Sequence, residues 1–518
     1  MSNACRSAPA ASCWRVLFLA LWLALLAGCA QLPTLHGRSV SHVLPDTDAT
    51  ALGRAFQPLV RAHPDRSGIV PLPDGLDAFA ARIALANAAQ RSLDVQYYIW
   101  HDDLSGGLLF DALRRAADRG VRVRLLLDDS NTEGLDEVLR ALDAHPGIEV
   151  RLFNPFANRH WRALDALTDF ARVNRRMHNK SFTADNQVTV IGGRNIGDEY
   201  FEARPGLLFL DLDVLALGPV VHEVSDDFDR YWASDSAYPI RRLLAPPGSA
   251  PARTHAQAAP SAETARALRA AVARTGFLDD LEAGRTPIEW ARTTLVSDDP
   301  AKGLDRAARD GQLTARLQRV LGGPPERELQ VVSSYFVPGD RGTTWFDDLA
   351  RRGVRVRVLT NALEATDVPA VHAGYARWRP ALLDAGVELY ELKRSAERAT
   401  RHQRIFRGSS TSSLHAKVFV VDRARVFVGS FNFDPRSAHL NTELGFVIDS
   451  SALARRMAQQ FTERVPLLAY RVRLEAGALQ WVEQDAAGTH VYTQEPHAGF
   501  WRQLGVSLMS LLPIEGML

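Results

Sequence analysis

Cysteine is nearly absent from this 518-residue sequence, and the absence limits the chemistry that the protein can perform. The three cysteines, Cys5, Cys13 and Cys29, all lie close to the N-terminus. The rest of the chain has no thiol for a disulfide, a zinc-thiolate site or a cysteine nucleophile. HExxH, CxxC and GxxxxGK[ST] motifs are also missing, so the sequence predicts no metal and no other cofactor.

The sequence also lacks an excess of charge of either sign, and it has few long apolar runs. The 61 Lys and Arg residues and the 60 Asp and Glu residues nearly cancel to a net charge of +1, whereas a dedicated nucleic-acid binder usually carries a basic excess. Beyond the N-terminus the longest apolar stretch, Gly206–Val221, is interrupted by Asp211 and Asp213. It therefore falls short of the roughly 20 apolar residues of a membrane span. We expect a globular protein of two or more domains that binds no nucleic acid.

The N-terminus has the pattern of an export signal. The apolar run Val16–Ala27 follows Arg6 and Arg15 and is short for a mature membrane span. It ends in Leu26-Ala-Gly-Cys29, which resembles the bacterial lipobox, with an uncleaved anchor helix as the alternative. The resemblance implies a signal peptide over residues 1–28, a lipid on Cys29 and a tether over residues 29–60. The protein would be exported and lipid-anchored on the periplasmic side of a bacterial membrane, and Ala30 favours the outer membrane over the inner.

An internal repeat organises the rest of the chain. Three segments with the alternating pattern of strands recur in the same order, and a helix pattern follows the first of each set. Gly120 and Gly353 occupy equivalent places, where each would end a helix before a Val-Arg-Val-Arg strand. This order predicts an α/β protein with two pseudo-symmetric halves, each a mixed, largely parallel sheet flanked by helices. The paired segments are Leu93–Trp100 with Leu329–Phe336, Asp118–Leu127 with Arg351–Leu359, and Gly147–Phe153 with Gly386–Leu392.

Composition indicates where the two halves begin and end. Residues 245–261 are rich in Pro, Ala and Gly, which is typical of a linker. The apolar stretch Phe500–Leu512 could lie in a bilayer interface or form a helix docked on the core, and the following Pro513 favours docking. We expect a first half over residues 61–244, a linker over 245–262, a second half over 263–480 and a C-terminal extension over 481–518.

Each half contains the same group of polar residues after its last paired strand. An HxKxxxxD motif is followed by a Gly-x-x-Asn motif, with the Asn 17 residues after the His in both copies. One such motif arises easily by chance on a solvated strand, but two copies in register with a repeat are a strong signal. The residues are His178, Lys180, Asp185 and Asn195 in the first half and His415, Lys417, Asp422 and Asn432 in the second.

These residue types suit phosphodiester chemistry. Residues i and i+2 of a strand point to the same face, so each His would stand beside its Lys. Cleavage of a phosphodiester needs a nucleophile at phosphorus, an acid for the leaving alkoxide, and donors for the non-bridging oxygens. Two His, two Lys and two Asn supply all three, and the Gly before each Asn would let the backbone pass close to a ligand.

The paired motifs resemble those of the phospholipase D superfamily from about Leu93 to Gly445, and further segments resemble bacterial cardiolipin synthases, especially the type C branch. The resemblance implies an active site at the interface of two phospholipase D-like domains and a phosphohistidine intermediate. His178 would attack phosphorus and His415 would protonate the leaving alcohol, or the reverse. The further segments are Gly192–Phe201, Ser297–Lys302, Asp367–Tyr375 and Leu512–Glu515.

A nucleophilic His needs an acceptor for its other ring nitrogen. Asp211 and Glu443 fall at similar places after each Asn and enter similar apolar strands, so they are the candidates. The alternative for both is a carboxylate that is satisfied at the start of a strand. Asp185 and Asp422, which end the HxKxxxxD motifs, suit a turn-stabilising or Lys-pairing role instead.

Five further residues have weaker claims to a role. Asp128 and Asp129 end an apolar strand beside the expected cleft and could touch substrate. His372 and Tyr375 are spaced i, i+3 on an expected helix, where they could contact a lipid headgroup or form a half-buried surface pair. His101 has no motif context and is interpreted as an ordinary surface or core histidine.

We expect a cardiolipin synthase-like phosphatidyltransferase that acts at a membrane on phosphatidylglycerol, with phosphatidylethanolamine as a second candidate. The alternative is a phospholipase D that hydrolyses phospholipids to phosphatidic acid, because it shares every catalytic residue and differs only in the acceptor. The near-neutral charge and the lipid anchor disfavour an exported nuclease. The complete motifs disfavour a catalytically dead lipid-binding scaffold. Protein partners stay unidentified.

Overall fold

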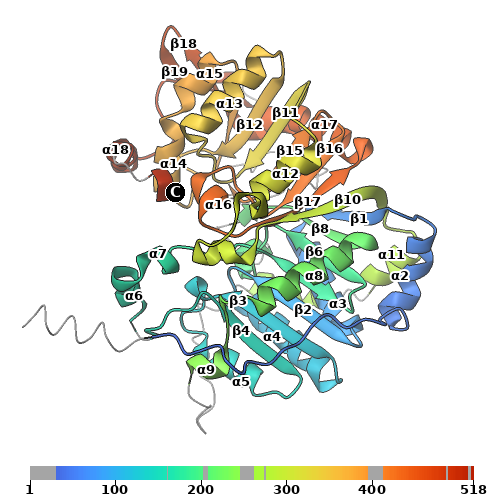
Figure 1. Ribbon diagram of the computed structural model, residues 1–518. Coiled ribbons are helices and arrows are strands. Elements are labelled where there is room, and N and C mark those ends of the chain that lie inside the picture. The colour runs from blue at the N-terminus through green and yellow to red at the C-terminus, as the bar shows by residue number, and fades with distance from the viewer. Residues whose placement is uncertain are drawn as a thin grey trace, which may run out of the picture.

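The two sequence repeats fold into two α/β halves that lie side by side, the first below and the second above in Figure 1. The computed structural model describes residues 31–159, 161–201, 208–244, 262–273, 276–394, 412–485, 488–511 and 515–517. The predicted signal peptide, Cys29 and almost all of the predicted linker lie outside these residues. Within the described ranges, 18 strands pair edge to edge in one continuous sheet.

In the first half the strands pair in the order β9–β4–β3–β2–β5–β6–β8–β1. Strands β2, β3 and β4 are parallel because helices cross over between them, and the other pairs are antiparallel. The strands are β1 (Ser67–Leu72), β2 (Ser92–Tyr97), β3 (Arg122–Asp128), β4 (Ile148–Phe153), β5 (Ser181–Ala184), β6 (Val188–Gly192), β8 (Asp213–Leu217) and β9 (Ala237–Pro239).

The second half repeats this order as β13–β12–β11–β15–β16–β17–β10 and extends it beyond β13 by β18, β19 and β20. Antiparallel pairing of β1 with β10, with Gly68 opposite Trp290, joins the two halves. The strands are β10 (Glu289–Ser297), β11 (Glu328–Ser333), β12 (Arg355–Asn361), β13 (Glu388–Leu392), β15 (Lys417–Val421), β16 (Arg425–Gly429), β17 (Leu444–Asp449), β18 (Ala469–Glu475), β19 (Ala478–Asp485) and β20 (Gly488–Tyr492). A separate parallel pair links β7 (Leu208–Leu210) to β14 (Ser412–Leu414).

Helices cover both faces of each half. In the first half α3 and α4 pack on one face and α8 on the other. In the second half α12 and α13 cover one face and α17 the other. The helices are α2 (Ala51–Arg61), α3 (Gly75–Ala88), α4 (Leu104–Asp118), α5 (Asp136–Asp143), α6 (Arg162–Thr168), α7 (Phe170–Val173), α8 (Pro219–Ala233), α9 (Ile240–Leu243), α10 (Ala262–Ala273), α11 (Phe277–Glu282), α12 (Leu313–Leu321), α13 (Gly339–Arg351), α14 (Pro369–Ala376), α15 (Arg379–Asp384), α16 (Pro435–His439), α17 (Ser451–Leu468) and α18 (Phe500–Met509).

Local sequence accounts for the ends of these helices. The Asp103 side chain accepts a hydrogen bond from the Gly106 N–H and so caps the first turn of α4. Gly120 follows α4 with a φ of 91°, and Gly353 follows α13 with a φ of 82°. This left-handed conformation suits glycine, as the repeat predicted. No described helix is both long enough and apolar enough to cross a bilayer.

Tight hairpin turns make the sheet less parallel than predicted. Asp185 and Asn186 have φ values of 51° and 53°, and the Gln187 N–H donates to the Ala184 carbonyl, which closes a turn between β5 and β6. Asp422–Arg423 makes the same turn between β15 and β16. Such left-handed two-residue turns join antiparallel strands. The mixed sheet is therefore confirmed, but its predicted parallel character is wrong outside β2–β4 and β11–β13.

Residues 31–61 pack on the first half, so the prediction of a tether up to residue 60 is wrong for this segment. The Arg38 guanidinium donates to the Ser234 carbonyl over 2.5 Å, and Arg151 donates to the Ser39 carbonyl over 2.7 Å. Helix α2 adds Leu52 to the core of the first half. The physical reason is that α2 has an apolar face that must be buried.

Two other boundaries also differ from the prediction. Helices α10 and α11, predicted to belong to the second half, bury Leu268, Ala271 and Leu281 in the core of the first half, beside α3. Strand β19 runs across the predicted boundary at residue 480, because the second sheet continues through β20.

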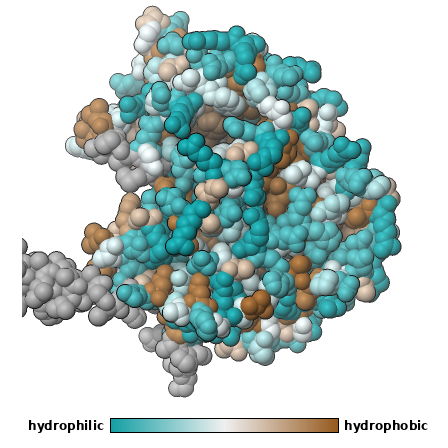
Figure 2. All heavy atoms as spheres, in the orientation of Figure 1, coloured by the Kyte–Doolittle hydropathy of each residue, from teal (hydrophilic) through white to brown (hydrophobic). Residues whose placement is uncertain are grey.

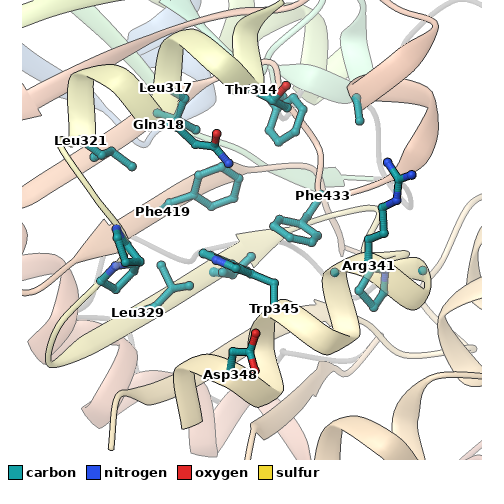
Figure 3. A pocket seen from close by; sticks show the side chains of 18 of the residues that line it. Thr314, Leu317, Gln318, Leu321, Leu329, Arg341, Trp345, Asp348, Phe419 and Phe433 are labelled. Carbon is teal, nitrogen blue, oxygen red and sulfur yellow. The ribbon is translucent and has the colours of Figure 1, made fainter. Parts of the chain in front are cut away.

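A groove opens between α12 and α13 in the second half (Figure 3). Its volume is about 1180 Å³, and Leu329 and Phe419 contribute to its apolar lining. At the equivalent place in the first half, α3 and α4 pack against each other. Phe431 and Phe433 line the groove and flank Asn432, so one wall of the groove adjoins a predicted site residue.

Candidate active site

The two motifs meet at the junction between the halves. His178 lies in the extended segment before β5, and its N–H donates to the Thr442 carbonyl of the second half over 2.8 Å. His415 lies just before β15, which begins at Lys417. The histidines thus precede the strands in which they were predicted to lie. For His178 the bridge between Met177 and Thr442 explains the difference, because it ties this segment to the opposite half.

Each histidine is bonded to a carboxylate from the opposite half. His178 Nδ1 lies 2.8 Å from Oε2 of Glu443, and His415 Nδ1 lies 2.5 Å from Oδ2 of Asp211. All four side chains are buried. A carboxylate at Nδ1 holds the proton on that nitrogen and leaves Nε2 as the reactive ring atom. The crossed pairing therefore places two equivalent imidazoles in one site.

The Gly-x-x-Asn segments make room for these carboxylates. A Cβ atom on Gly193 would lie only 2.1 Å from Oδ1 of Asp211. In the second half Ser430 takes the place of Gly193, and its hydroxyl donates to Oε2 of Glu443. The close approach at Gly193 thus serves the orienting carboxylate, whereas the sequence interpretation assigned that space to a ligand.

The motif lysines line the same site. Lys180 Nζ donates to the carbonyl of His178 over 2.6 Å, and Lys417 Nζ donates to the carbonyl of His415. Lys417 Nζ also lies 3.3 Å from Oγ of Ser334. These bonds hold each ammonium next to its histidine, and an ammonium has three hydrogens to donate. Each lysine can therefore also donate a hydrogen bond to an anionic phosphate.

The motif asparagines are fixed through their carbonyl oxygens. Asn195 Oδ1 accepts a hydrogen bond from the Ile99 N–H over 3.2 Å, and Asn432 Oδ1 accepts one from the Ser334 hydroxyl over 2.9 Å. Both asparagines are buried. Since the oxygen of each amide is occupied, its NH₂ group is the end that suits a phosphate oxygen.

Burial shifts the pKa values of the site in different directions. Desolvation, together with neighbouring cations, lowers the pKa of His178 well below its usual value and lowers that of His415 as well. Burial also lowers the pKa of Lys180 to about 7 and raises that of Glu443 to about 7. Burial alone would raise the pKa of Asp211, but the charges of His415 and of nearby cations hold it below its usual value.

Comparison with known proteins identifies the family of the chain. A family model described as "Cardiolipin synthase, PLD-like domain" matches residues 83–232 and 325–465, which together make more than half of the sequence. The protein belongs to this family. The two matched regions correspond to the two halves of the fold.

Relatives of this PLD-like protein support the assignment. The chain is 52% identical over 472 residues to the cardiolipin synthase C of Escherichia coli (strain K12), covering 90% of this chain and 99% of that protein. It is 27% identical over 378 residues to the cardiolipin synthase B of Shigella flexneri, covering 73% and 75%. The protein is therefore an enzyme of the phospholipase D superfamily, and the resemblance noted in the sequence is confirmed.

A solved structure supports the fold of this PLD-like enzyme. The phosphatidylserine synthase of Haemophilus influenzae Rd KW20 superposes with a TM-score of 0.54 at 13% identity, covering 90% of this chain and 100% of that chain. At this identity the likeness concerns the fold alone. It agrees with two α/β halves that share one junction.

In this PLD-like enzyme the aspartates of the two HxKxxxxD motifs bind backbone amides. Each follows its strand at the end opposite the histidine, and each has a left-handed φ in the hairpin turn. Of the alternatives for Asp185 and Asp422, the geometry supports turn stabilisation and gives neither a catalytic position. The donors are the N–H groups of Gln90, Arg91 and Ser92 to Asp185, and of Glu326, Arg327 and Glu328 to Asp422.

Two tyrosines that the sequence analysis did not single out contact the histidines. The ring centroid of Tyr98 lies 4.9 Å from that of His178, and Tyr200 lies 5.4 Å from His415, both edge-on. The internal repeat could have identified Tyr98 as a residue of the site. Tyr98 occupies the place in the first half that Ser334, the partner of Lys417 and Asn432, occupies in the second.

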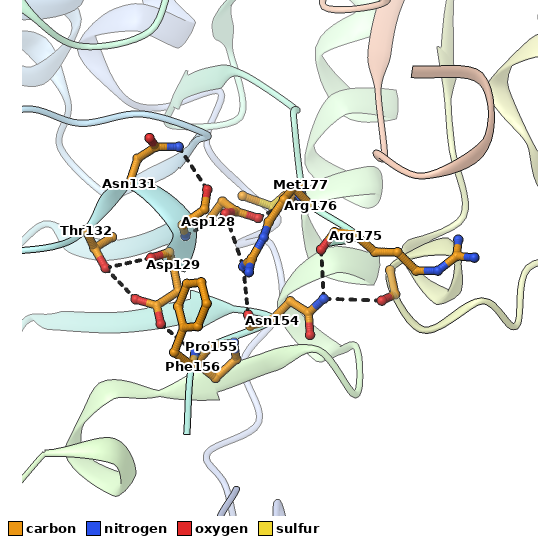
Figure 4. A network of polar contacts seen from close by, with 12 residues as sticks. Asp128, Asp129, Asn131, Thr132, Asn154, Pro155, Phe156, Arg175, Arg176 and Met177 are labelled. Carbon is orange, nitrogen blue, oxygen red and sulfur yellow. Dashed lines mark hydrogen bonds and ion pairs between the residues drawn. The ribbon is translucent and has the colours of Figure 1, made fainter. Parts of the chain in front are cut away.

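Asp128 and Asp129 hold the segment that leads to His178 (Figure 4). The Asp128 carboxylate accepts from the Met177 N–H over 2.7 Å, and Asp129 accepts from the Phe156 N–H over 2.7 Å. Both aspartates are 0% exposed. The protein's own donors thus occupy both carboxylates, so the geometry supports a structural role for Asp128 and Asp129 and no contact with substrate.

His372 and Tyr375 are both buried, so they do not form the half-buried surface pair that was one of their two predicted roles. His372 Nε2 lies 3.2 Å from Oε1 of Glu495. The Arg379 guanidinium lies 5.1 Å from the centre of the Tyr375 ring. The difference arises because the C-terminal extension, which carries Glu495, covers α14.

His101 belongs to a group that the sequence analysis also missed. The ligand atoms of His101, Asp103 and Glu199 lie within 4.8 Å of one another, close enough to hold a cation. His101 Nδ1 lies 3.0 Å from Oε1 of Glu199. The Asp103 carboxylate already accepts from the N–H groups of Gly106 and Asp198, so it serves the fold at the start of α4.

Proposed function

We propose that the protein is a cardiolipin synthase, which transfers a phosphatidyl group from one phospholipid to a hydroxyl of another. Phosphatidylglycerol is the proposed substrate, with phosphatidylethanolamine as a second participant. The observation that carries the proposal is the crossed pairing of His178 with Glu443 and of His415 with Asp211 in one buried site. The high identity to a cardiolipin synthase C supports it.

In the first step His178 Nε2 attacks the phosphorus of the donor lipid. As the P–N bond forms, the P–O bond to the leaving alcohol breaks, and His415 gives its Nε2 proton to the leaving alkoxide. The motif lysines and asparagines stabilise charge on the non-bridging oxygens. The products are a phosphatidyl-histidine and an alcohol, which is glycerol when phosphatidylglycerol is the donor.

In the second step a lipid hydroxyl takes the place of the departed alcohol. His415, now neutral, accepts the hydroxyl proton while the oxygen bonds to phosphorus. The P–N bond to His178 breaks, and the electron pair returns to Nε2. Both histidines recover their starting states, so the balanced cycle requires no cofactor.

Electrostatics favours this division of roles over the reverse. Burial lowers the pKa of both histidines, but Asp211 raises the pKa of His415 against this effect, whereas the pKa of His178 falls well below its usual value. His178 is therefore the ring that stays neutral, so its Nε2 lone pair can attack. The depressed pKa of Asp211 keeps that carboxylate anionic, where it stabilises a protonated His415. Glu443, with a pKa of about 7, gives weaker support to a positive charge on His178.

Substrate binding changes the charge of the site. Lys180, with a pKa of about 7 in its buried position, is only partly protonated at neutral pH. A phosphodiester anion beside it favours the ammonium form. The lysine therefore acquires full charge when the group that it must stabilise is bound.

We also propose that a lipid on Cys29, which lies outside the described residues, tethers the enzyme to the periplasmic side of a bacterial membrane, the outer membrane rather than the inner. The sequence Leu26-Ala-Gly-Cys29 supports the lipid anchor, and Ala30 after it supports the outer membrane. A radiolabelled fatty acid should be incorporated into the wild type but not into Cys29→Ser. An unlabelled wild type would refute the tether.

The product of the reaction tests the proposed synthase. Purified enzyme would be incubated with vesicles of phosphatidylglycerol and phosphatidylethanolamine, with each lipid isotopically labelled in turn, and the products separated by chromatography. We expect more cardiolipin than phosphatidic acid, and the labels identify donor and acceptor. His178→Ala serves as the inactive control.

Other outcomes would reassign the enzyme. Phosphatidic acid as the main product at every lipid ratio would make it a phospholipase D, because water would then be the acceptor. Cleavage of DNA at a comparable rate would place it outside lipid metabolism. Turnover by His178→Ala would contradict the two-histidine mechanism itself.

A further inference from the structure

Two groups of exposed apolar side chains lie on either side of the junction between the halves. Tryptophan is prominent in both, since Trp501 is 79% exposed and Trp161 is 75% exposed. We name them the α18 patch and the α6 patch. The α18 patch consists of Phe500, Trp501, Leu504, Leu508 and Leu511, and the α6 patch consists of Trp161, Leu167 and Phe170.

Helix α18 is docked on the protein by its other side. Val506 is buried against Leu363 and Ala373. The Arg502 guanidinium donates to the Thr366 carbonyl over 2.5 Å. The helix is thus held in a fixed orientation, and its remaining apolar side chains face outward. The prediction of a docked helix is confirmed for one side of α18, and the other side is exposed to solvent.

The α6 patch is also held in place by polar contacts beneath it. The buried Asp165 carboxylate of α6 accepts from the Ala157 N–H over 2.5 Å. Asn154 Nδ2 donates to the carbonyls of Arg172 and Arg175, each over 2.8 Å. These bonds fix the loop and the short helices α6 and α7. The three large apolar side chains of the patch are therefore held at the surface and exposed to solvent.

Both patches are connected to the catalytic residues by short paths. Thr366, the partner of α18, precedes Asp367, whose carboxylate accepts from the Tyr335 hydroxyl over 2.8 Å. Tyr335 follows Ser334, which is bonded to Asn432. On the other side α7 ends at Val173, five residues before His178.

The two patches project from the same side of the molecule. In Figure 1, α6 and α7 lie at the left of the first half, and α18 lies at the left of the second half. Figure 2, in the same orientation, shows apolar surface at both places. One flat surface could therefore contact both patches at once.

We propose that the α18 patch and the α6 patch insert together into the interface of a lipid bilayer, one on each side of the active-site junction. The inference rests on the proposed function, since a phospholipid substrate must enter from a membrane. Amphipathic helices that bind bilayers present Trp, Phe and Leu on one face, and Trp favours the boundary between headgroups and acyl chains. Both patches have this composition.

The geometry favours a bilayer over a protein as the occupant. A protein that covered both patches would also span the junction between them, where the two halves that carry the histidines meet. A bilayer supplies the substrate at the same place. Insertion of both patches would also fix the distance between the active site and the lipid headgroups of the bilayer.

Tryptophan fluorescence tests the proposal with the full-length enzyme. The protein would be reconstituted on vesicles of phosphatidylglycerol and phosphatidylethanolamine with or without brominated acyl chains, which quench tryptophans that are inserted. The chain has 10 tryptophans. We expect the double variant Trp161→Phe/Trp501→Phe to lose about half or more of the quenching. The matched control Trp290→Phe, in β10, should lose little.

Turnover provides a second measurement. Leu167→Ser combined with Leu508→Ser should lower the rate on vesicles by about 10-fold or more, with the rate on a dispersed short-chain phospholipid within about twofold of wild type. Leu467→Ser, which removes an exposed leucine from α17, is the control and should leave both rates unchanged.

Three results would overturn the proposal. Equal quenching of the wild type and the double variant would show that the patches stay outside the bilayer. Equal losses on vesicles and on dispersed lipid would show that the patches support turnover without a membrane. A dimer in lipid-free buffer that the patch variants dissociate would make a second copy the occupant. None of these results depends on the product, so a hydrolase could still confirm the docking.

Discussion

The two halves of the active site share their motifs but differ in the carboxylate that holds each histidine. His415 is paired with the short Asp211 beside Gly193, where a side chain would collide with the carboxylate. His178 is paired with the longer Glu443, which also accepts a hydrogen bond from a serine hydroxyl. The two carboxylates have opposite pKa shifts, downward for Asp211 and upward to about 7 for Glu443.

This difference shows how a duplicated motif can supply two distinct catalytic groups. A nucleophile must be neutral before it attacks, whereas a general acid must hold a proton in the same site at the same pH. Identical half-sites would give both histidines the same protonation state. Pairing one histidine with a carboxylate that stays anionic, and the other with one that is partly protonated, separates the two roles.

Replacement of the histidines should have the largest effect and should separate their roles. His178→Ala and His415→Ala should each lower phospholipid turnover by about 10⁴-fold or more, because catalytic groups that act as a unit are strongly interdependent. A donor lipid with a nitrophenol leaving group needs no proton to leave. With that donor His415→Ala should still form the covalent phosphatidyl-enzyme, visible by mass spectrometry of the intact protein.

His178→Ala should form no such adduct with either donor. The assignment of nucleophile and acid would be reversed if His178→Ala carried the adduct and His415→Ala did not. A histidine variant with substantial turnover of natural lipid would contradict the shared site altogether.

Replacement of the two carboxylates should have smaller and unequal effects. Asp211→Asn should lower turnover by about 10² to 10⁴-fold, since the anion that stabilises protonated His415 is lost. Glu443→Gln should cost only about 10-fold. Glu443 is already partly protonated at neutral pH, so the neutral amide imitates a form that the enzyme populates. Steady-state rates on mixed vesicles would measure both.

The pH profile sharpens the same comparison. With a pKa of about 7, Glu443 is neutral below that pH and anionic above it. Its anion supports the attack by His178, so wild-type turnover should rise as the pH increases through about 7. Glu443→Gln should flatten this rise, and Asp211→Asn should retain it. An unchanged rise in Glu443→Gln would show that the deprotonation of another group causes it.

The sequence predicted the repeated part of the molecule well. The alternating apolar segments identified β2, β3 and β4 and their counterparts, because burial of one face imposes a period of two on a strand. A turn at Asp185 and at Asp422 was one of two predicted alternatives, but the antiparallel hairpin was not predicted, since neither Asp-Asn nor Asp-Arg is the Asn-Gly or Asp-Gly pair that most clearly signals such a turn. The predicted sheets were therefore more parallel than those observed.

The site was only partly predictable for a similar reason. The motifs identified the histidines, lysines and asparagines, because their spacing is local. The pairing of His178 with Glu443 joins residues 265 positions apart and depends on how the halves are placed. Tyr200 likewise reaches His415 only through the fold. Nothing in a single sequence reports such distances.

The motif aspartates should show the smallest effect on turnover. Asp185 is 0% exposed and accepts from three backbone N–H groups, whereas Asp422 is partly exposed to solvent. Asn keeps the left-handed turn but offers one acceptor oxygen instead of two. Asp185→Asn should lower the free energy of unfolding by about 1–3 kcal/mol, because buried amides lose their partner.

Asp422→Asn should lower the free energy of unfolding by less than Asp185→Asn does, since water can replace the lost acceptor at a partly exposed turn. Turnover per folded molecule should stay within about twofold of wild type for both variants, because neither carboxylate lies at the histidines. Denaturant unfolding and active-site titration would measure the two quantities separately. A variant that kept its unfolding free energy but lost most of its turnover would return that aspartate to the catalytic group.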